Sequence, residues 1–154
     1  MNFPTVRLAQ FAALLHQSTH LFSKVLETNS LTEVERLFEI ETSAFWRDHY
    51  QFGKASIQQE KRLSRDFIHL IVINTVAPFL FHFGKSRALE APPKRALELL
   101  EQLPAESNSM LEGWINLGFT PQNAFQSQAL IQLKTRYCDE KKCLDCAIAA
   151  AILK

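Results

Sequence analysis

The run Phe67-Ile-His-Leu-Ile-Val-Ile-Asn-Thr-Val-Ala-Pro-Phe-Leu-Phe-His-Phe83 is the most apolar part of the sequence. Its middle, residues 71–76, is rich in β-branched side chains and could form a buried strand. Length and flanks favour a helix, because Ser64 can cap the N-terminal end and Gly84 can end the helix in a left-handed conformation. Pro78 predicts a kink, since proline lacks the N–H that a helix uses. We therefore predict a buried central helix around which the other elements pack.

The same run raises the question of a membrane span. It barely reaches the shortest spanning length of about 17 residues, and it carries polar side chains such as His69, Asn74 and His82. A core helix is the more economical interpretation, so we predict no membrane partner. Residues 1–7 lack the basic region and apolar segment of a secretion signal. We expect a cytoplasmic location.

Apolar side chains recur at helical spacing on both sides of this run. Towards the N-terminus, Pro4 is tolerated in a first helical turn, and Leu8, Phe11, Ala12 and Leu15 fall on one helical face. Other starts and stops follow the same rules. The remaining predicted helices begin at Ser30 (a capping box with Glu33), near Phe45 (ending at Gly53), at Pro92, at Ser109 (a box with Glu112, ending at Gly118), at Thr120 and at Cys143.

Size and composition agree with one helical domain. The chain has 154 residues, of which 47% are hydrophobic and 21% charged, an ordinary globular balance that excludes a disordered chain. No segment alternates polar and apolar residues for long enough to predict a strand. We predict an all-α fold, a compact bundle of about seven or eight helices with short loops, as a single domain over residues 1–154.

Three cysteines form the most chemically specific segment. Cys143 and Cys146 make a C-x-x-C pair, and Cys138 precedes it by five residues. Thiolates at this spacing can converge on one cation at a turn between helices. A tetrahedral zinc site needs a fourth ligand, which would have to come through tertiary contact. The candidates for it are His16, His20, His49 and His82.

Two other interpretations of the cysteines compete with zinc. The segment resembles the four-cysteine loop of iron–sulfur DNA glycosylases, but its spacer is shorter and the fourth position falls in the ligand-free run 147–152. The glycine-rich hairpin by which those enzymes hold the phosphate backbone is also missing, so we discount both the cluster and DNA-repair chemistry. The simpler interpretation is three reduced thiols that pack as small apolar groups at a turn. Zinc is thus a possible cofactor and no other is predicted.

Histidines and carboxylates supply weaker candidates. His16 and His20 have the four-residue spacing that aligns two imidazoles on a helix, but a break near Ser18 would misalign them. A hydrolase or metalloenzyme would need a pocket that holds at least two of His16, His20, His49 and Glu41. We predict no catalytic residues. His69 and Asn74 are expected to be hydrogen-bonded in the core, and the basic groups Lys61-Arg62 and Lys94-Arg95 to be solvated.

Several segments are similar to a bacterial family catalogued as domain of unknown function 2851. The resemblance covers nearly the whole chain and includes residues 3–10, 14–18, 21–24, 49–53, 73–79, 123–130 and 137–148. It implies that the chain corresponds to the C-terminal helical part of a longer protein, and it implies no settled activity.

Together these observations predict a helical accessory or interaction domain with a cysteine corner. Its expected partner is an upstream domain or another protein. With 17 basic and 16 acidic side chains, the formal charge of +1 offers no general footprint for nucleic acid. A nucleic-acid-associated module is therefore the alternative, suggested only by the cysteine segment, and the hydrolase ranks below it. Oligomeric state is not predicted.

Overall fold

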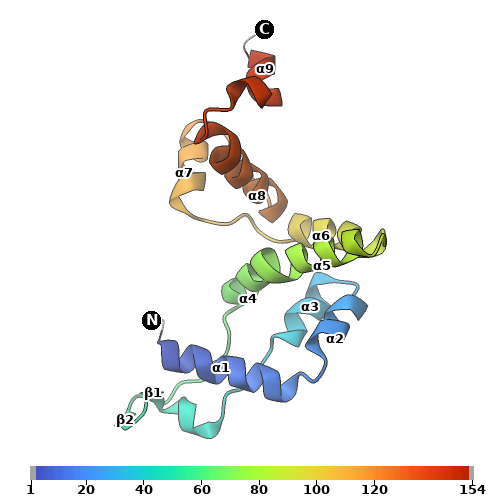
Figure 1. The fold of residues 1–154 in the computed structure, drawn as a ribbon. Helices are drawn as coiled ribbons and strands as arrows, with labels where there is room; N and C mark the ends of the chain where they lie inside the picture. Colours follow the sequence, from blue (N-terminus) through green and yellow to red (C-terminus); the bar gives the residue numbers. More distant parts are fainter. Residues whose placement is uncertain (1–2, 153–154) are drawn as a thin grey trace. The chain divides into compact units, whose positions relative to one another are not determined.

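The structure, a computed structural model, describes residues 3–152 and is helical apart from one short hairpin (Figure 1). The all-α prediction is confirmed. In chain order the elements are α1 (Pro4–Gln17), α2 (Leu21–Glu27), α3 (Leu31–Leu37), the 3-10 turn η1 (Ala44–Arg47), β1 (His49–Gln51), β2 (Lys54–Ala55), α4 (Arg65–Ile71), the π-helical turn η2 (Val72–Val76), α5 (Ala77–Ser86), α6 (Ala91–Gln102), α7 (Ser109–Asn116), α8 (Ala124–Leu133), the π-helical turn η3 (Lys134–Cys138), the 3-10 turn η4 (Cys143–Asp145) and α9 (Ala147–Ile152).

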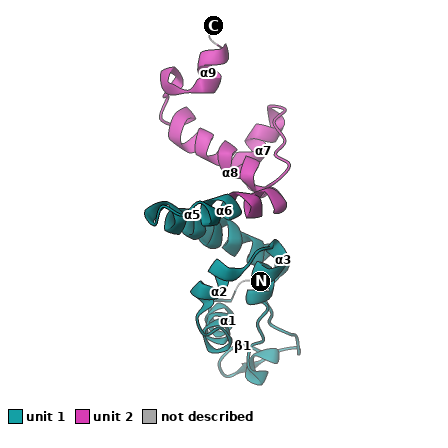
Figure 2. Ribbon diagram, turned by 90° about the vertical axis from the view of Figure 1, so that its right-hand side faces the viewer, with its two compact units in different colours: residues 1–96 teal, residues 97–154 magenta. Residues whose placement is uncertain are grey.

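The chain divides into two compact units, residues 1–96 and 97–154, with the boundary inside α6 (Figure 2). One domain over residues 1–154 stays a prediction.

The apolar run of unit 1 is a helix, as predicted. α4, η2 and α5 join into one helix from Arg65 to Ser86, and Ser64 caps it by accepting a hydrogen bond from the Phe67 amide at 3.3 Å. Where the sequence predicts a kink at Pro78, the structure has the wider π-helical turn η2 shortly before that proline. Length and composition make this the one helix of residues 3–152 that could cross a membrane, but 44% of its apolar window is buried and a core helix meets the same criteria.

The core of unit 1 lies along this helix. Val72 and Leu80 of the helix and Val34 of α3 are completely buried. The capping box of α3 is confirmed, because the Ser30 hydroxyl accepts from the Glu33 amide at 3.2 Å. A matching bond runs from the Asn29 amide to Glu33 Oε2 at 2.7 Å.

Two predicted helix ends in unit 1 are wrong. Gly84 does not end a helix, because α5 continues to Ser86. A Cβ at Gly84 would lie 2.2 Å from Pro93 Cδ, so glycine is needed there for close packing. Gly53 lies in the turn of the β1–β2 hairpin with φ +72°, and the predicted helix near Phe45 is limited to η1. The aromatic and extended preferences of Tyr50 and its neighbours outweigh the helical spacing there.

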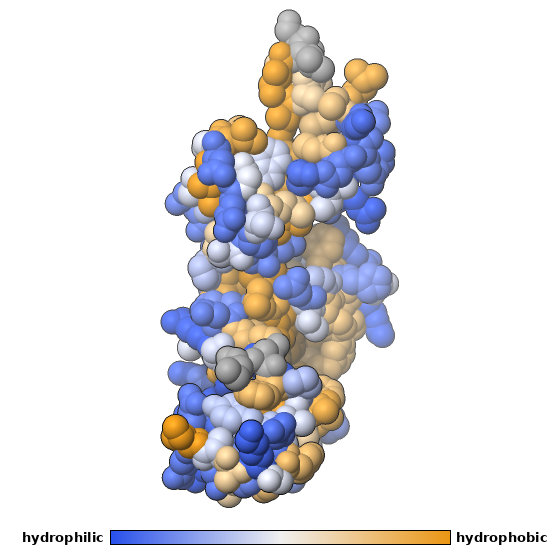
Figure 3. All heavy atoms as spheres, turned by 90° about the vertical axis from the view of Figure 1, so that its left-hand side faces the viewer, coloured by the Kyte–Doolittle hydropathy of each residue, from blue (hydrophilic) through white to orange (hydrophobic). Residues whose placement is uncertain are grey.

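In unit 2, two helices begin a few residues away from the predicted caps. Asn108, and not Ser109, caps α7 by accepting from the Met110 and Leu111 amides. Asn123 caps α8 in place of Thr120. The stop at Gly118 is confirmed, since it has φ +89° and the Phe119 amide donates to the Trp114 carbonyl at 2.9 Å. The face drawn in Figure 3 shows apolar residues at the surface of both units, among hydrophilic ones.

Candidate functional site

The three cysteines lie at the turn between η3 and α9, as free thiols. Cys138 and Cys143 are exposed and Cys146 is buried. Within residues 3–152, no group of three or more His, Cys, Asp or Glu side chains gathers as a metal-ligand set. The structure therefore gives the zinc site no support, and zinc bound by these thiols stays a prediction.

The cysteines do line an apolar cavity of about 290 Å³ within unit 2. Its other walls come mainly from α7, α8 and α9, and they include Trp114, Leu133 and Ile148. The indole Nε1 of Trp114 is buried and has no hydrogen-bond partner. The chemistry of this cavity suits apolar groups.

The histidines predicted as ligands lie on separate elements. α1 ends at Gln17 and His20 has φ +60° before α2, so His16 and His20 do not lie on one continuous helix. His49 Nδ1 lies 2.7 Å from Asp48 Oδ1 and 3.0 Å from the Phe45 carbonyl oxygen, both of which accept, and the ring stacks on Phe45. His82 is exposed on α5. Among residues 3–152, no histidine lines the apolar cavity at the cysteines or the cavities that Lys61 and Glu41 line.

His69 is hydrogen-bonded in the core, as predicted, and its partner is an acid that sequence reasoning missed. Its Nε2 lies 2.6 Å from Glu35 Oε1, which also accepts from Arg65 Nε at 3.0 Å. Partial burial alone would raise the pKa of the Glu35 carboxyl, but these hydrogen bonds and charges hold the pKa below its ordinary value. Asn74 differs from expectation: it is exposed and donates to the Leu70 carbonyl. No cavity described here opens on the Glu35–His69 pair, so its evident role is to join α3 to α4.

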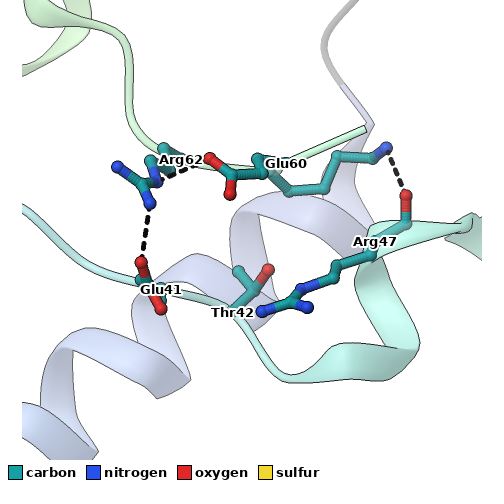
Figure 4. Close-up of a pocket in the computed structure, with 6 residues that line it drawn as sticks. Glu41, Thr42, Arg47, Glu60 and Arg62 are labelled. Carbon is teal, nitrogen blue, oxygen red and sulfur yellow. Dashed lines mark hydrogen bonds and ion pairs between the residues drawn. The ribbon is translucent and has the colours of Figure 1, made fainter. Parts of the chain in front are cut away.

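The prediction that Lys61 is solvated is wrong, because only 6% of this residue is exposed. Its ammonium donates to the carbonyls of Gln59 at 3.0 Å and Arg47 at 3.4 Å, and it lies 3.9 Å from the centre of the Tyr50 ring. The bond to the Arg47 carbonyl is drawn in Figure 4. A charged group at this depth is unusual unless it is paired.

The neighbouring charges are paired with each other. Arg62 Nη2 lies 2.7 Å from Glu41 Oε1, and Arg62 Nε lies 2.9 Å from Glu60 Oε2. Figure 4 shows this guanidinium between the two carboxylates. Glu41, one of the predicted acid–base candidates, is therefore the partner of a cation.

Lys61 lines a polar cavity of about 310 Å³ in unit 1. One wall is the first two turns of α1, which contribute Arg7 and Gln10, and the other is Tyr50 with the segment from Gln59 to Ser64. Gln10, which is buried, connects the walls by donating from Nε2 to the carbonyls of Lys61 at 3.0 Å and Arg62 at 3.1 Å. Burial of a glutamine and a lysine has no periodic signature, so sequence reasoning could not separate them from surface residues.

The comparisons with known proteins give one match. The model of a family described as a protein of unknown function, DUF2851, matches residues 1–109. All residues that line the polar cavity lie in the matched range, whereas the resemblance at residues 123–130 and 137–148, including the cysteines, lies outside it. No curated protein and no solved structure matches the chain.

Proposed function

This chain belongs to the DUF2851 family, and from that premise we propose that it is a helical interaction module which binds an amphipathic helix of a partner protein along α1. One observation carries this proposal: the apolar face predicted from the spacing of α1 is directed to solvent.

The face of α1 that the sequence spacing marks as apolar is not the face that packs against unit 1. Val6, Gln10 and Leu14 are buried. By contrast, Leu8, Phe11 and Leu15 are 68%, 57% and 60% exposed. Large apolar side chains exposed in a row are uncommon in monomeric proteins and mark interaction surfaces. We call these three residues the α1 stripe.

The spacing of the α1 stripe matches a helical partner. Its members are separated by three and then four residues, which is the a/d spacing that packs knobs into holes against a second helix. Ala9, Ala12 and Ala13 flank the stripe, and small side chains permit a close approach of two helices. At about 1.5 Å per residue, the 14-residue helix α1 offers a contact about 21 Å long.

Charge favours a partner helix with acidic flanks. α1 contains no Asp or Glu, and of its two basic residues Arg7 lines the inward cavity while His16 is exposed. A second copy of α1 would therefore bring no opposite charge. Helices that lie on membranes are usually rich in Lys and Arg on the polar face, and α1 has a single arginine and no lysine.

The test uses two labelled synthetic helices with leucine at every a and d position, one with glutamate and one with lysine at the flanking e and g positions. We expect fluorescence anisotropy to detect binding of the glutamate helix, and weaker binding of the lysine helix. Phe11→Asp should abolish binding. Phe52→Asp is the matched control, because Phe52 is an even more exposed phenylalanine in the β1–β2 turn, and this variant should bind as the wild type does.

Three results would reject the proposal. The first is that neither peptide binds. The second is that the wild type self-associates in sedimentation through Phe11, which would mean that a second copy of the chain covers the α1 stripe. The third is that the wild type binds lipid vesicles through Phe11, which would mean that a membrane covers it.

The cysteine corner, Cys138, Cys143 and Cys146, stays a separate proposal. It is either a structural staple, in which a bound zinc joins the three thiolates, or a corner of free thiols in unit 2. About one equivalent of zinc in protein purified without added metal would support the staple. The nucleic-acid and hydrolase alternatives have no observation in their favour.

A further inference from the structure

We propose that the polar cavity between α1 and the segment Gln59–Ser64 binds an oxyanion group, phosphate or carboxylate, of a small molecule, with Lys61 as its counter-ion. This site is distinct from the α1 stripe, because it is formed by the opposite, inward side of α1.

The first step is the unneutralised charge of Lys61. None of the ion pairs among the described residues includes this ammonium, whose hydrogen-bond acceptors are two backbone carbonyls. The ammonium also lies over the Tyr50 ring, 3.9 Å from its centre, and neither the two carbonyls nor the ring brings a formal negative charge. Removing a charge from water without an opposite charge is costly, and a bound anion offsets that cost.

The second step is the charge balance of the cavity wall. Arg7, Lys61 and Arg62 line the cavity together with one acid, Glu60. The carboxylate of Glu60 is held by Arg62 at 2.9 Å, so it does not neutralise Lys61. The lining thus has three basic residues and one acid, although the whole chain is nearly neutral.

The third step is preorganisation. The guanidinium of Arg7 is positioned by its bond to Gln10 Oε1 at 3.0 Å and by the ring of Phe67, 3.8 Å from its Cζ atom. The Tyr50 hydroxyl donates to Gln59 Oε1 at 2.8 Å, which fixes the opposite wall. Donors that are held in place before binding lose little entropy when an anion arrives.

Size and lining indicate the class of ligand. A cavity of about 310 Å³ is in the range of small-molecule sites. Arg and Lys together are the usual residues for phosphate and carboxylate groups, and Arg can bind such a group through two parallel hydrogen bonds. Phe3 and Tyr50 add aromatic surface for an uncharged part of the same molecule.

The experiment is a titration of ¹⁵N-labelled full-length protein with sodium phosphate and, separately, sodium acetate, at constant ionic strength set with sodium chloride. We expect the amide signals of Tyr50, Gln59 and Lys61 to shift and saturate, and the signal of Lys54 on β2 to stay in place. Saturation with phosphate alone assigns a phosphate group, and saturation with acetate a carboxylate. Both results support the site.

Two variants separate binding from general charge. Lys61→Met keeps the length of the side chain and removes the ammonium, and we expect the dissociation constant to rise about tenfold or more. Lys54→Met removes an exposed lysine of the neighbouring hairpin, and it should change the dissociation constant less than about twofold. If Lys61→Met does not fold, the pattern of shifted amides in the wild type still decides.

The proposal is overturned if neither anion shifts these signals at about 20 mM, a concentration that detects even millimolar affinity. It is also overturned if Lys61→Met binds as the wild type does, because Lys61 would then be a structural donor to two carbonyls. Phe11→Asp should leave anion binding unchanged, so failure of the α1 stripe and failure of this site are distinguishable.

Discussion

His69 and Glu35 are 34 residues apart in sequence, and their side chains meet at 2.6 Å between Nε2 and Oε1. Both side chains are largely buried, and the contact joins α4 to α3 beside the fully buried Val34. Arg65 Nε completes the arrangement at 3.0 Å from the same oxygen.

The Glu35 carboxylate should therefore contribute to stability. In Glu35→Gln the charge is lost while the shape is kept, and His69 and Arg65 lose their charged acceptor. We expect the free energy of unfolding to fall by about 1–3 kcal/mol, measured by urea denaturation. Glu27→Gln, at the exposed end of α2, is the control and should change it by less than about 0.5 kcal/mol. Equal effects of the two variants would contradict a specific role for Glu35.

The lowered pKa of Glu35 predicts that the free energy of unfolding depends on pH. The pKa of Glu35 is lower in the folded chain than its ordinary value of 4.5, so the unfolded chain binds the proton more tightly. The stabilisation is fully present above pH 4.5 and is lost as the pH falls through the lower folded pKa. Unfolding free energies measured from pH 6 to pH 3 should therefore converge for wild type and Glu35→Gln. A difference that stays constant over this range would show that the carboxylate charge is not responsible.

Gly84 offers a second prediction, with an internal control. A Cβ at Gly84 would lie 2.2 Å from Pro93 Cδ and 2.6 Å from Cγ, so α5 and the start of α6 would have to separate. We expect Gly84→Ala to cost about 1–3 kcal/mol by overpacking. Gly113 lies in α7, and a Cβ added there would meet no atom within 4 Å, so Gly113→Ala should instead stabilise by about 0.5–1 kcal/mol. Thermal unfolding that moves in the same direction for both variants would refute this explanation.

Arg95 gives the third prediction. Its guanidinium donates from Nη2 to the Val25 carbonyl and from Nη1 to the Leu26 carbonyl, each at 2.9 Å, and also to the carbonyl of Thr28. These carbonyls end α2, where cations are favourable and acceptors lack helical partners. We expect Arg95→Met to lower the unfolding free energy by about 2–4 kcal/mol. Arg95→Lys should not restore it fully, since one ammonium does not reproduce the planar fork.

The neighbouring Lys94 provides the control for this prediction. It is exposed, and Lys94→Met should have a small effect in the same denaturation experiment. An Arg95→Met protein as stable as Lys94→Met would mean that the α2 carbonyls are satisfied by water.

Local signals predicted the helices well, because caps and stops depend on a few adjacent residues. Ser30, Ser64 and Gly118 have the roles that their spacing indicates. These local signals failed where packing against a segment distant in the sequence determines the structure. A glycine after an apolar stretch, as at Gly84, is typical of a helix end. Here, however, glycine is required because the ring of Pro93 packs against this position.

The candidate sites show the same limit more strongly. Spacing places the α1 stripe on one face, but it cannot tell whether that face meets a core or solvent. Lys61 looks like a surface charge until Gln10, 51 residues earlier, is seen to donate to its carbonyl. The cysteine spacing is compatible with a metal site, but spacing alone does not bring a fourth ligand.

The thiols supply the last prediction, which distinguishes a metal staple from inert cysteines. Cys138 and Cys143 are exposed and Cys146 is buried, and all three are free. In native protein, a thiol reagent such as Ellman's should therefore label two groups rapidly. The third should react only as fast as the unit opens, and at once in denaturant, since access governs the rate. If zinc held all three thiolates, none would react rapidly until a chelator was added, because bound thiolates are protected by the metal. Cys143→Ser should leave one rapid group and an unchanged melting temperature, whereas a fall in that temperature together with three protected thiols would establish the staple.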